Sequence, residues 1–187
     1  MPGFAHFDPT VKGLAAPVSA VIRQATAEDL DGLAAIKLAV VTRTRERWAE
    51  LIGEGQDLDD QLLLVATVGD TVAAFAQAVR FDEHPTVPGP AGYYLCGVTV
   101  QPEFRRMGLG RRLTVVRLDW IRERADEAWC FANADNRASI HLHRAFGFEE
   151  VQRARTIHGV TFGAGEGILF RSSLDGGTSR EEVHARP

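Results

Sequence analysis

The sequence predicts a single α/β domain built around one mixed sheet. Three observations support this fold class. The 187 residues match the usual length of one domain, and 45% hydrophobic with 25% charged residues can form a buried core. In addition, runs with strand character alternate with helical periodicity in the order β-α-α-β-β-β-α-β-α-β-β.

The first elements follow a proline-rich arm. Residues 1–17 contain three prolines and two glycines, which is typical of an extended segment. We expect the domain itself to span residues 18–172, beginning with a short strand over 19–26. Thr26 is the expected N-cap of the next helix, with Asp29 three residues on as in a capping box.

Two helices are expected before the first hairpin. Apolar residues recur at a spacing of three to four from Leu30 to Val40, and a second short helix is expected over 45–52. Residues 61–81 then contain two strands joined by a tight turn at Gly69 and Asp70.

The middle of the chain contains a loop, a strand and a helix. Residues 82–92 hold three prolines and two glycines, so we expect a loop there, followed by a strand over 93–100. The next segment shows one helical stripe of apolar residues. Its members are Leu109, Leu113, Val116, Trp120 and Ile121.

The last part repeats the alternation of strand and helix. We expect a strand over 127–135 and a helix over 136–146, with Gly147 at its C-terminal end. Residues 148–172 predict two more strands joined around His158 and Gly159. The remaining residues, 173–187, form a polar tail.

Composition argues against several classes of protein. A net charge of −4 provides no broad basic surface, so we expect no nucleic-acid partner. No apolar run reaches the ~20 residues of a transmembrane helix, and no secretory signal pattern begins the chain, so we expect no membrane association. Cys96 and Cys130 lack metal-ligand spacing, which predicts no metal site and a reducing, cytoplasmic environment.

The segment QPEFRRMGLGRRL, residues 101–113, lies where a strand meets a helix. The first N–H groups of a helix have no partner within the helix, and glycines let the backbone approach a ligand closely. With four arginines beside them, these groups suit a phosphorylated ligand, above all a pyrophosphate. The dinucleotide fingerprint does not fit, because it needs a further glycine at position 113, where this chain has leucine. The P-loop pattern does not fit either, because the segment has no Lys-Ser/Thr pair.

The same segment resembles the acetyl-CoA motif of the GCN5-related N-acetyltransferases, V-x-P-x-x-[RQ]-x-x-G-x-[GA], from Val100 to Gly110 without a mismatch. The family's second motif, N-x-x-[AS]-x-x-L-[YF]-x-x-x-G-F, resembles residues 136–148, although His143 stands in place of the aromatic residue. Residues 22–30 resemble the usual first strand and helix start. The resemblance extends over roughly residues 19–171.

This resemblance implies a family-like fold with a splayed central sheet and acetyl-CoA as co-substrate. The pantetheine arm would lie in a gap between the strands over 93–100 and 128–134, and the pyrophosphate would bind the amides at the start of the following helix. The residues implied in acetyl-CoA binding are Val98, Val100, Arg105, Arg106, Met107, Gly108, Leu109, Gly110, Arg111, Asn136 and Ser139.

Catalysis requires three groups. A backbone amide of residues 98–100 is the expected donor to the tetrahedral oxyanion. The family usually places a tyrosine at position 143 as the acid that protonates the departing thiolate. His143 either takes this role or is a surface histidine, in which case the thiolate leaves unaided.

The general base is less clearly indicated, because residues 93–100 contain no carboxylate. Glu83 and Tyr94 are the candidates, each with the alternative of a loop or core residue. His84 and Tyr93 are further possibilities beside them. Cys96 is a conceivable nucleophile, but a cysteine inside a strand is more often a small buried hydrophobic residue.

The acceptor is expected to be a small-molecule amine, such as an amino-acid-like metabolite or an antibiotic. Its site would be formed by the helices over 27–52, the loop over 83–91 and the last strands. The alternatives are a protein N-terminus or lysine as acceptor, and a CoA-binding regulatory module without catalysis. Homodimerisation is possible, but the sequence indicates no interface.

Overall fold

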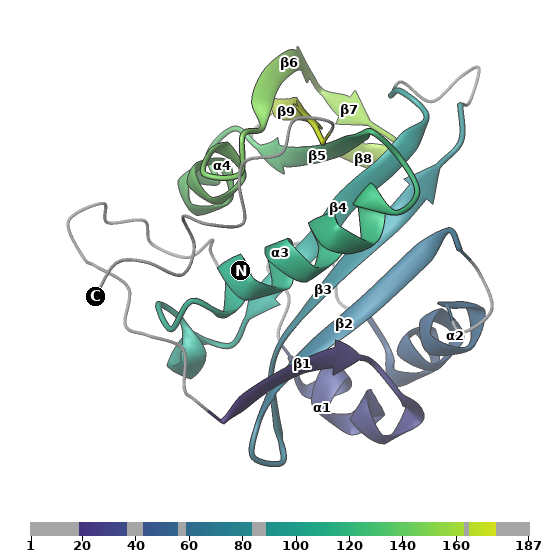
Figure 1. The fold of residues 1–187 in the computed structure, drawn as a ribbon, viewed down its shortest axis with the longest axis vertical. Coiled ribbons are helices and arrows are strands. Elements are labelled where there is room, and N and C mark those ends of the chain that lie inside the picture. The colour runs from purple at the N-terminus through teal and green to yellow at the C-terminus, as the bar shows by residue number, and fades with distance from the viewer. Residues whose placement is uncertain (1–18, 37–42, 56–58, 84–88, 163–164, 175–187) are drawn as a thin grey trace.

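A seven-stranded sheet forms the centre of the computed structural model, which describes residues 19–36, 43–55, 59–83, 89–162 and 165–174 (Figure 1). Its strands lie in the order β1-β2-β3-β4-β5-β9-β6. They are β1 (Ala20–Gln24), β2 (Gln61–Val68), β3 (Thr71–Phe81), β4 (Gly92–Val100), β5 (Glu127–Asn133), β9 (Gly167–Ser173) and β6 (Glu149–Ala154). All neighbouring pairs are antiparallel except β4 and β5.

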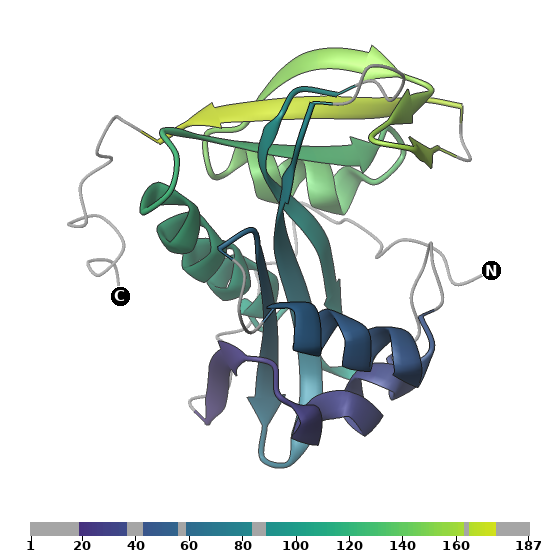
Figure 2. The same ribbon diagram turned by 90° about the vertical axis from the view of Figure 1, so that its right-hand side faces the viewer.

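Helices cover both faces of this sheet (Figures 1 and 2). A 3₁₀ turn, η1 (Ala27–Asp29), leads into α1 (Leu30–Ala35), and α1 packs with α2 (Arg45–Gly55) around Trp48 and Phe75 on one face. On the other face α3 (Leu109–Arg122) and α4 (Arg137–Arg144) close a second apolar core. The predicted mixed α/β domain is confirmed.

The first helical turn begins as predicted at Thr26. Its backbone N–H donates to Asp29 at 2.8 Å, and Arg23 binds both oxygens of the same carboxylate at 2.6 and 2.8 Å. Burial alone would raise the pKa of Asp29, but the hydrogen bonds from Arg23 and Thr26 bring it below its ordinary value. The helix is shorter than predicted, because Ile36 is already extended and buried in the core. Val40 lies outside the described residues.

Helix α3 does not bury the stripe that was predicted for it. Leu109, Leu113 and Ile121 are buried, whereas Val116 is 38% exposed. The buried position one turn after Leu113 belongs to Arg117, which is fully buried. The prediction failed here because only apolar residues were assigned to the core.

The C-terminal segment contains four strands instead of the two that were predicted. The turn at His158 and Gly159 does exist, but it joins only β7 (Thr156–Ile157) to β8 (Val160–Thr161). The long strands β6 and β9 pair with each other, and β9 lies between β5 and β6. Strand β6 carries no buried residue, so it lacks the alternation that would have marked its boundaries.

The sheet splits in its middle, as the family resemblance implied. Strands β4 and β5 pair in parallel only at Tyr94 with Trp129 and Leu95 with Cys130, although both strands continue beyond these pairs. In Figure 2 the strands on the two sides of this split point in clearly different directions. The edge of β4 from Cys96 to Val100 therefore faces a gap and not a neighbouring strand.

Within the described residues, no helix combines the length and apolar composition needed to cross a membrane.

Candidate active site

The loop before α3 has the backbone shape of an anion site. A 3₁₀ turn, η2 (Pro102–Phe104), ends β4, and Arg106 and Gly108 both have positive φ angles, 66° and 78°. Gly108 is the N-cap of α3. The amides that follow have no earlier carbonyl within the helix to bond, and the positive end of the helix dipole lies at the same point. Leu109 is 1% exposed and packs in the apolar core below α3, so its side chain is not available to a ligand.

Three of the four arginines in this segment have clearly different surroundings. Arg105 donates through Nε to the carbonyl of Val100 at 3.2 Å, and the Arg111 guanidinium lies 5.0 Å from the ring centroid of Phe146 beyond α4. Arg112 instead donates to the carbonyl of Ala20 at 3.0 Å and so ties α3 to β1. Arg105 and Arg111 thus lie at the two sides of the loop, while Arg112 has a structural contact.

Strand β4 carries a bulge beside the gap. Its pairing with β3 slips between Phe75–Thr99 and Gln77–Cys96, and Gly97 adopts a φ of 48°. A bulge leaves the extra residue without its regular ladder bonds. Val98 and Val100 follow it, pack against the core on the α3 face and line the unpaired edge.

Helix α4 presents its first turn and one buried histidine toward α3. Asn136 caps the helix, accepting from the Ser139 N–H at 3.1 Å. The Ser139 hydroxyl lies 3.3 Å from Nδ1 of His143. The three residues predicted on this element thus form one continuous chain of hydrogen bonds.

His143 is not a surface residue. It is 3% exposed and packs edge-on against Phe148, and its Nε2 is buried without a hydrogen-bond partner among the described residues. Burial, with a smaller contribution from the charge of Arg117, lowers the pKa of His143 to about 4. The ring is therefore neutral at pH 7. If the Ser139 hydroxyl donates to Nδ1, Nε2 carries the proton.

Sequence reasoning missed Arg117, whose buried guanidinium lies between α3 and the bulge. Its Nη1 donates to the carbonyls of Gln77 at 3.0 Å and Cys96 at 3.4 Å, which are register partners on β3 and β4. Nε and Nη2 bond the Leu113 carbonyl and the Thr114 hydroxyl. Burial lowers the pKa of Arg117 to about 10, so it remains charged. The available signal was a charged residue four positions from both Leu113 and Ile121.

Tyr94 lies on the opposite face of the sheet from α3. It is fully buried, its hydroxyl donates to the Pro90 carbonyl at 2.8 Å, and its ring contacts Phe81 and His158. Burial raises the pKa of Tyr94, so the phenol is protonated at neutral pH. His158 in turn stacks on Phe81 at 4.3 Å, which connects the β7–β8 turn to this cluster.

The remaining candidates are Glu83, His84 and Cys96. Glu83 is exposed, two residues beyond the end of β3, and His84 lies outside the described residues. Cys96 sits at the bulge, where burial raises its pKa to about 12 even though Arg117 and Arg43 are close enough to lower it. A protonated thiol is a weak nucleophile, which agrees with the interpretation of Cys96 as a packing residue.

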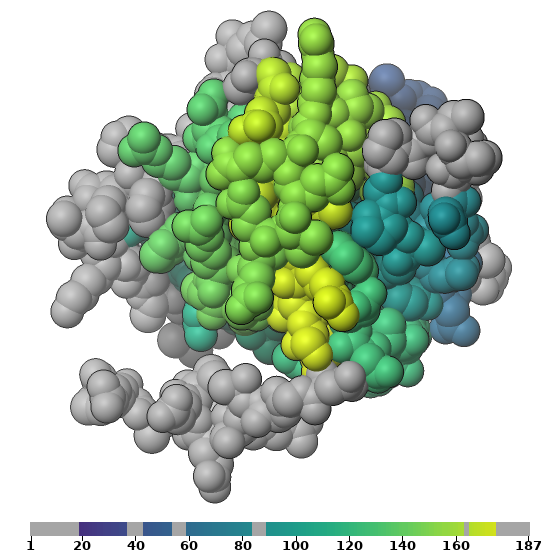
Figure 3. Space-filling model, turned by 90° about the horizontal axis from the view of Figure 1, so that it is seen from above, coloured from purple at the N-terminus to yellow at the C-terminus, as the bar shows by residue number. Residues whose placement is uncertain are grey.

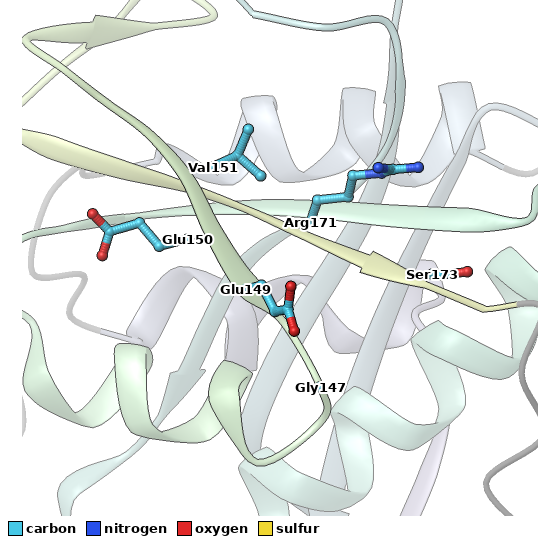
Figure 4. Close-up of a pocket in the computed structure, with 6 residues that line it drawn as sticks. All are labelled: Gly147, Glu149, Glu150, Val151, Arg171 and Ser173. Carbon is cyan, nitrogen blue, oxygen red and sulfur yellow. The ribbon is translucent and has the colours of Figure 1, made fainter.

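A surface hollow elsewhere on the molecule is not part of this arrangement. Figure 3 views the end of the molecule formed by β6 and β9, and Figure 4 shows Glu149 and Glu150 leaving β6 on opposite sides. The residues around the hollow belong to β6, β9 and the turn before β6; they are Gly147, Glu149, Glu150, Val151, Arg171 and Ser173. None comes from β4, α3 or α4, and Arg171 is paired with Glu127 at 2.6 Å.

Comparison with known sequences identifies relatives with two kinds of acceptor. The chain is 31% identical over 125 residues to the ribosomal protein bS18-alanine N-acetyltransferase of Salmonella typhimurium, covering 66% of this chain and 78% of the relative. It is 30% identical over 135 residues to the aminoglycoside N(6′)-acetyltransferase type 1 of Stenotrophomonas maltophilia, covering 71% and 88%.

Solved structures share the fold. The ribosomal-protein-alanine N-acetyltransferase of Brucella melitensis superposes with a TM-score of 0.66 at 27% identity, covering 82% of this chain and 99% of that one. Arabidopsis thaliana NAA60, solved with acetyl-CoA, gives 0.64 at 16% identity, covering 84% and 99%. The model of the acetyltransferase (GNAT) family matches residues 30–148. The chain is therefore a member of the GNAT family and an acyl-CoA-dependent N-acetyltransferase.

Proposed function

We propose that this enzyme transfers the acetyl group of acetyl-CoA to the primary amine of a small molecule by direct attack on the thioester. The observation that carries the proposal is the open edge of β4. It runs from the turn before α3 to the bulge at Gly97, and on the same face lies the buried Nε2 of His143, which has no hydrogen-bond partner among the described residues. The pantetheine arm of acetyl-CoA needs an open strand edge of this kind, with a site for the pyrophosphate at one end and polar groups near the thioester at the other.

The residues present fit acetyl-CoA. The turn with positive φ at Arg106 and Gly108 leads into the free amides of α3, which suit a pyrophosphate. Arg105 and Arg111 supply positive charge, and Met107, Leu109 and Gly110 contribute backbone. Gly110 leaves ordinary space, because an added Cβ would meet its nearest atoms at 3.8 and 4.0 Å. Asn136 and Ser139 would line the far side of the gap.

Each chemical step can be assigned to a group on this chain. The attacking amine must be neutral, whereas an alkylamine such as lysine, with a pKa of ~10.4, is mostly protonated at pH 7. Glu83 or a chain of water accepts that proton. Tyr94 is not assigned as the base, because its buried phenol is protonated and donates to the Pro90 carbonyl. An amide of residues 98–100 stabilises the oxyanion as the carbon–nitrogen bond forms. The carbon–sulfur bond then breaks, and Nε2–H of His143 donates a hydrogen bond to the departing thiolate.

The test is release of free CoA from acetyl-CoA, measured with a thiol reagent against a panel of amines. We expect amine-dependent release together with an acetylated product of matching mass. Tight CoA binding without turnover on any amine would instead support a CoA-binding regulatory module and overturn the proposal.

A protein N-terminus is the second candidate acceptor. It is favoured by the 31% identity with the bS18-alanine N-acetyltransferase of Salmonella typhimurium. Peptides beginning with alanine, included in the same panel, distinguish the two. If such peptides exceed every small amine in kcat/KM, the small-molecule proposal is wrong.

A further inference from the structure

On the face of the sheet opposite α3 lies an arginine, Arg43, that has no counter-ion among the described residues. Arg43 precedes α2, and its Nη1 donates to Oε1 of Gln77 at 2.7 Å. Its guanidinium carbon lies 4.9 Å from the ring centroid of Trp48. Gln77 and Trp48 are 3% and 1% exposed, so two rigid core residues fix the position of this cation.

Arg43 is close to the point where the thioester is expected. Gln77 is the register partner of Cys96, at the bulge where β4 separates from β5. The charge of Arg43 also acts on the Cys96 thiol, as does that of Arg117 from the opposite face. The cation thus lies across the sheet from the CoA side, where an acceptor can approach the thioester without crossing the CoA site.

The neighbouring arginines on this face form ion pairs, whereas Arg43 forms none within the part of the chain that the structure describes. Arg45 binds Asp31 at 2.7 Å and Arg47 binds Glu50 at 2.8 Å. Among the described residues no carboxylate lies within ion-pair distance of Arg43, and its Nε and Nη2 have no hydrogen-bond partner. These two atoms are absent from the buried unsatisfied groups of the described chain, so solvent or a ligand can reach them.

We infer that Arg43 binds a carboxylate of the acceptor, so that the substrate is a small amine that also carries a carboxylate, as an amino acid does. A half-buried guanidinium with two free donors in a planar fork matches a carboxylate in both charge and geometry. The same fixed positive charge repels polycationic amines. The inference rests on the proposed function and narrows its substrate class.

The first test compares matched acceptors in the CoA-release assay. The probes are L-amino acids, the corresponding L-amino-acid amides, and a polyamine. The amides have the less basic amine, so without carboxylate recognition they would react at least as well. We expect kcat/KM for the free acids to exceed that for the amides by ~10- to 100-fold, the range of a charge-assisted hydrogen-bond pair.

Three variants assign this preference to Arg43. We expect R43Q to lose the preference for the free acid, so that acid and amide have similar kcat/KM values. R43K should retain part of the preference, because lysine keeps the positive charge but lacks the two parallel N–H donors of the guanidinium. R45Q, which breaks an exposed ion pair on α2, should leave the ratio unchanged. Equal rates for acids and amides in the wild-type enzyme, or an unchanged ratio in R43Q, would overturn the inference.

A binding measurement keeps the inference testable if no amine is acetylated. Trp48 lies against the Arg43 guanidinium, so an added amino acid should change its fluorescence in the CoA-bound protein. We expect a saturable change in the wild type that is lost in both R43Q and W48F. With such a change and no turnover, the proposed catalysis fails and the carboxylate site stands. If the fluorescence does not change and turnover is also absent, both proposals fail.

Discussion

The two faces of the sheet at the split between β4 and β5 each hold an arginine, one fully buried and one half-buried, with different hydrogen-bond partners. On the α3 face, each nitrogen of Arg117 donates to a backbone carbonyl or a hydroxyl of the protein itself, and the side chain is fully buried. On the α2 face, Arg43 uses one nitrogen for Gln77, and its other two have no hydrogen-bond partner among the residues described. The difference separates a cation that shapes the strand bulge from one that is available for recognition.

Replacing Arg117 should have the largest effect and tests its assignment as the structural arginine of the pair. In R117M the carbonyls of Gln77 and Cys96 lose a buried donor, at ~1–3 kcal/mol for each unsatisfied group. We expect the free energy of unfolding, measured in urea, to fall by ~2–5 kcal/mol. R122M on the same helix breaks only the exposed pair with Asp119 and should change it by less than ~0.5 kcal/mol. Similar values for the two variants would show that Arg117 is not a structural cation.

The pH dependence of stability tests the burial of His143. Its folded pKa of about 4 lies below the ordinary value of 6.5, so the unfolded chain binds the extra proton first as pH falls. The free energy of unfolding should therefore fall by ~3 kcal/mol as the pH is lowered from about 6.5 to 4. Above pH 6.5 the contribution of His143 should not change with pH. The H143F variant should lack this slope in urea titrations. An equal slope in H143F would place its origin in other groups.

The contribution of His143 to catalysis is expected to be smaller in free energy than its effect on stability. H143F removes the Nε2–H donor to the departing thiolate, so we expect kcat to fall by ~10–100-fold with little change in the KM for acetyl-CoA. The control is H141F, an exposed position on the same helix, which should retain kcat. Because wild-type His143 stays neutral, its titration should not produce an inflection of kcat near pH 6.5. Wild-type kcat in H143F would mean that the thiolate leaves unaided.

Replacing Gly108, in the turn that we propose binds the pyrophosphate, is expected to have the smallest effect on the free energy of unfolding. G108A forces a side chain into a φ of 78°, at ~1–2 kcal/mol, and should also raise the KM for acetyl-CoA. G110A is the matched control two residues on, where an added Cβ makes only ordinary contacts. Its unfolding free energy should stay within ~0.5 kcal/mol of the wild type. Equal costs for both variants would argue against a conformational role for Gly108.

The sequence predicted those parts of the site that are contiguous in the chain. Arg105 to Arg111 form one turn and helix start, and Asn136, Ser139 and His143 share one helix, so spacing alone brought them together. Helix boundaries were harder to predict. Ile36 leaves its helix to enter the core, and β6 has no buried side chain to give it a period.

The family and the fold class could be predicted from the sequence, because they depend on short motifs and on the alternation of strand and helix patterns along the chain. The meeting of Arg43 and Arg117 at the two faces of the bulge could not be predicted, because it depends on how distant segments pack. Gln77 lies 34 residues from Arg43 and 40 from Arg117, and both pairs form when the helices close on β3 from its two faces. Such contacts follow from packing and not from periodicity. The carboxylate site that we propose at Arg43 therefore rests on the folded structure and could not be predicted from the sequence.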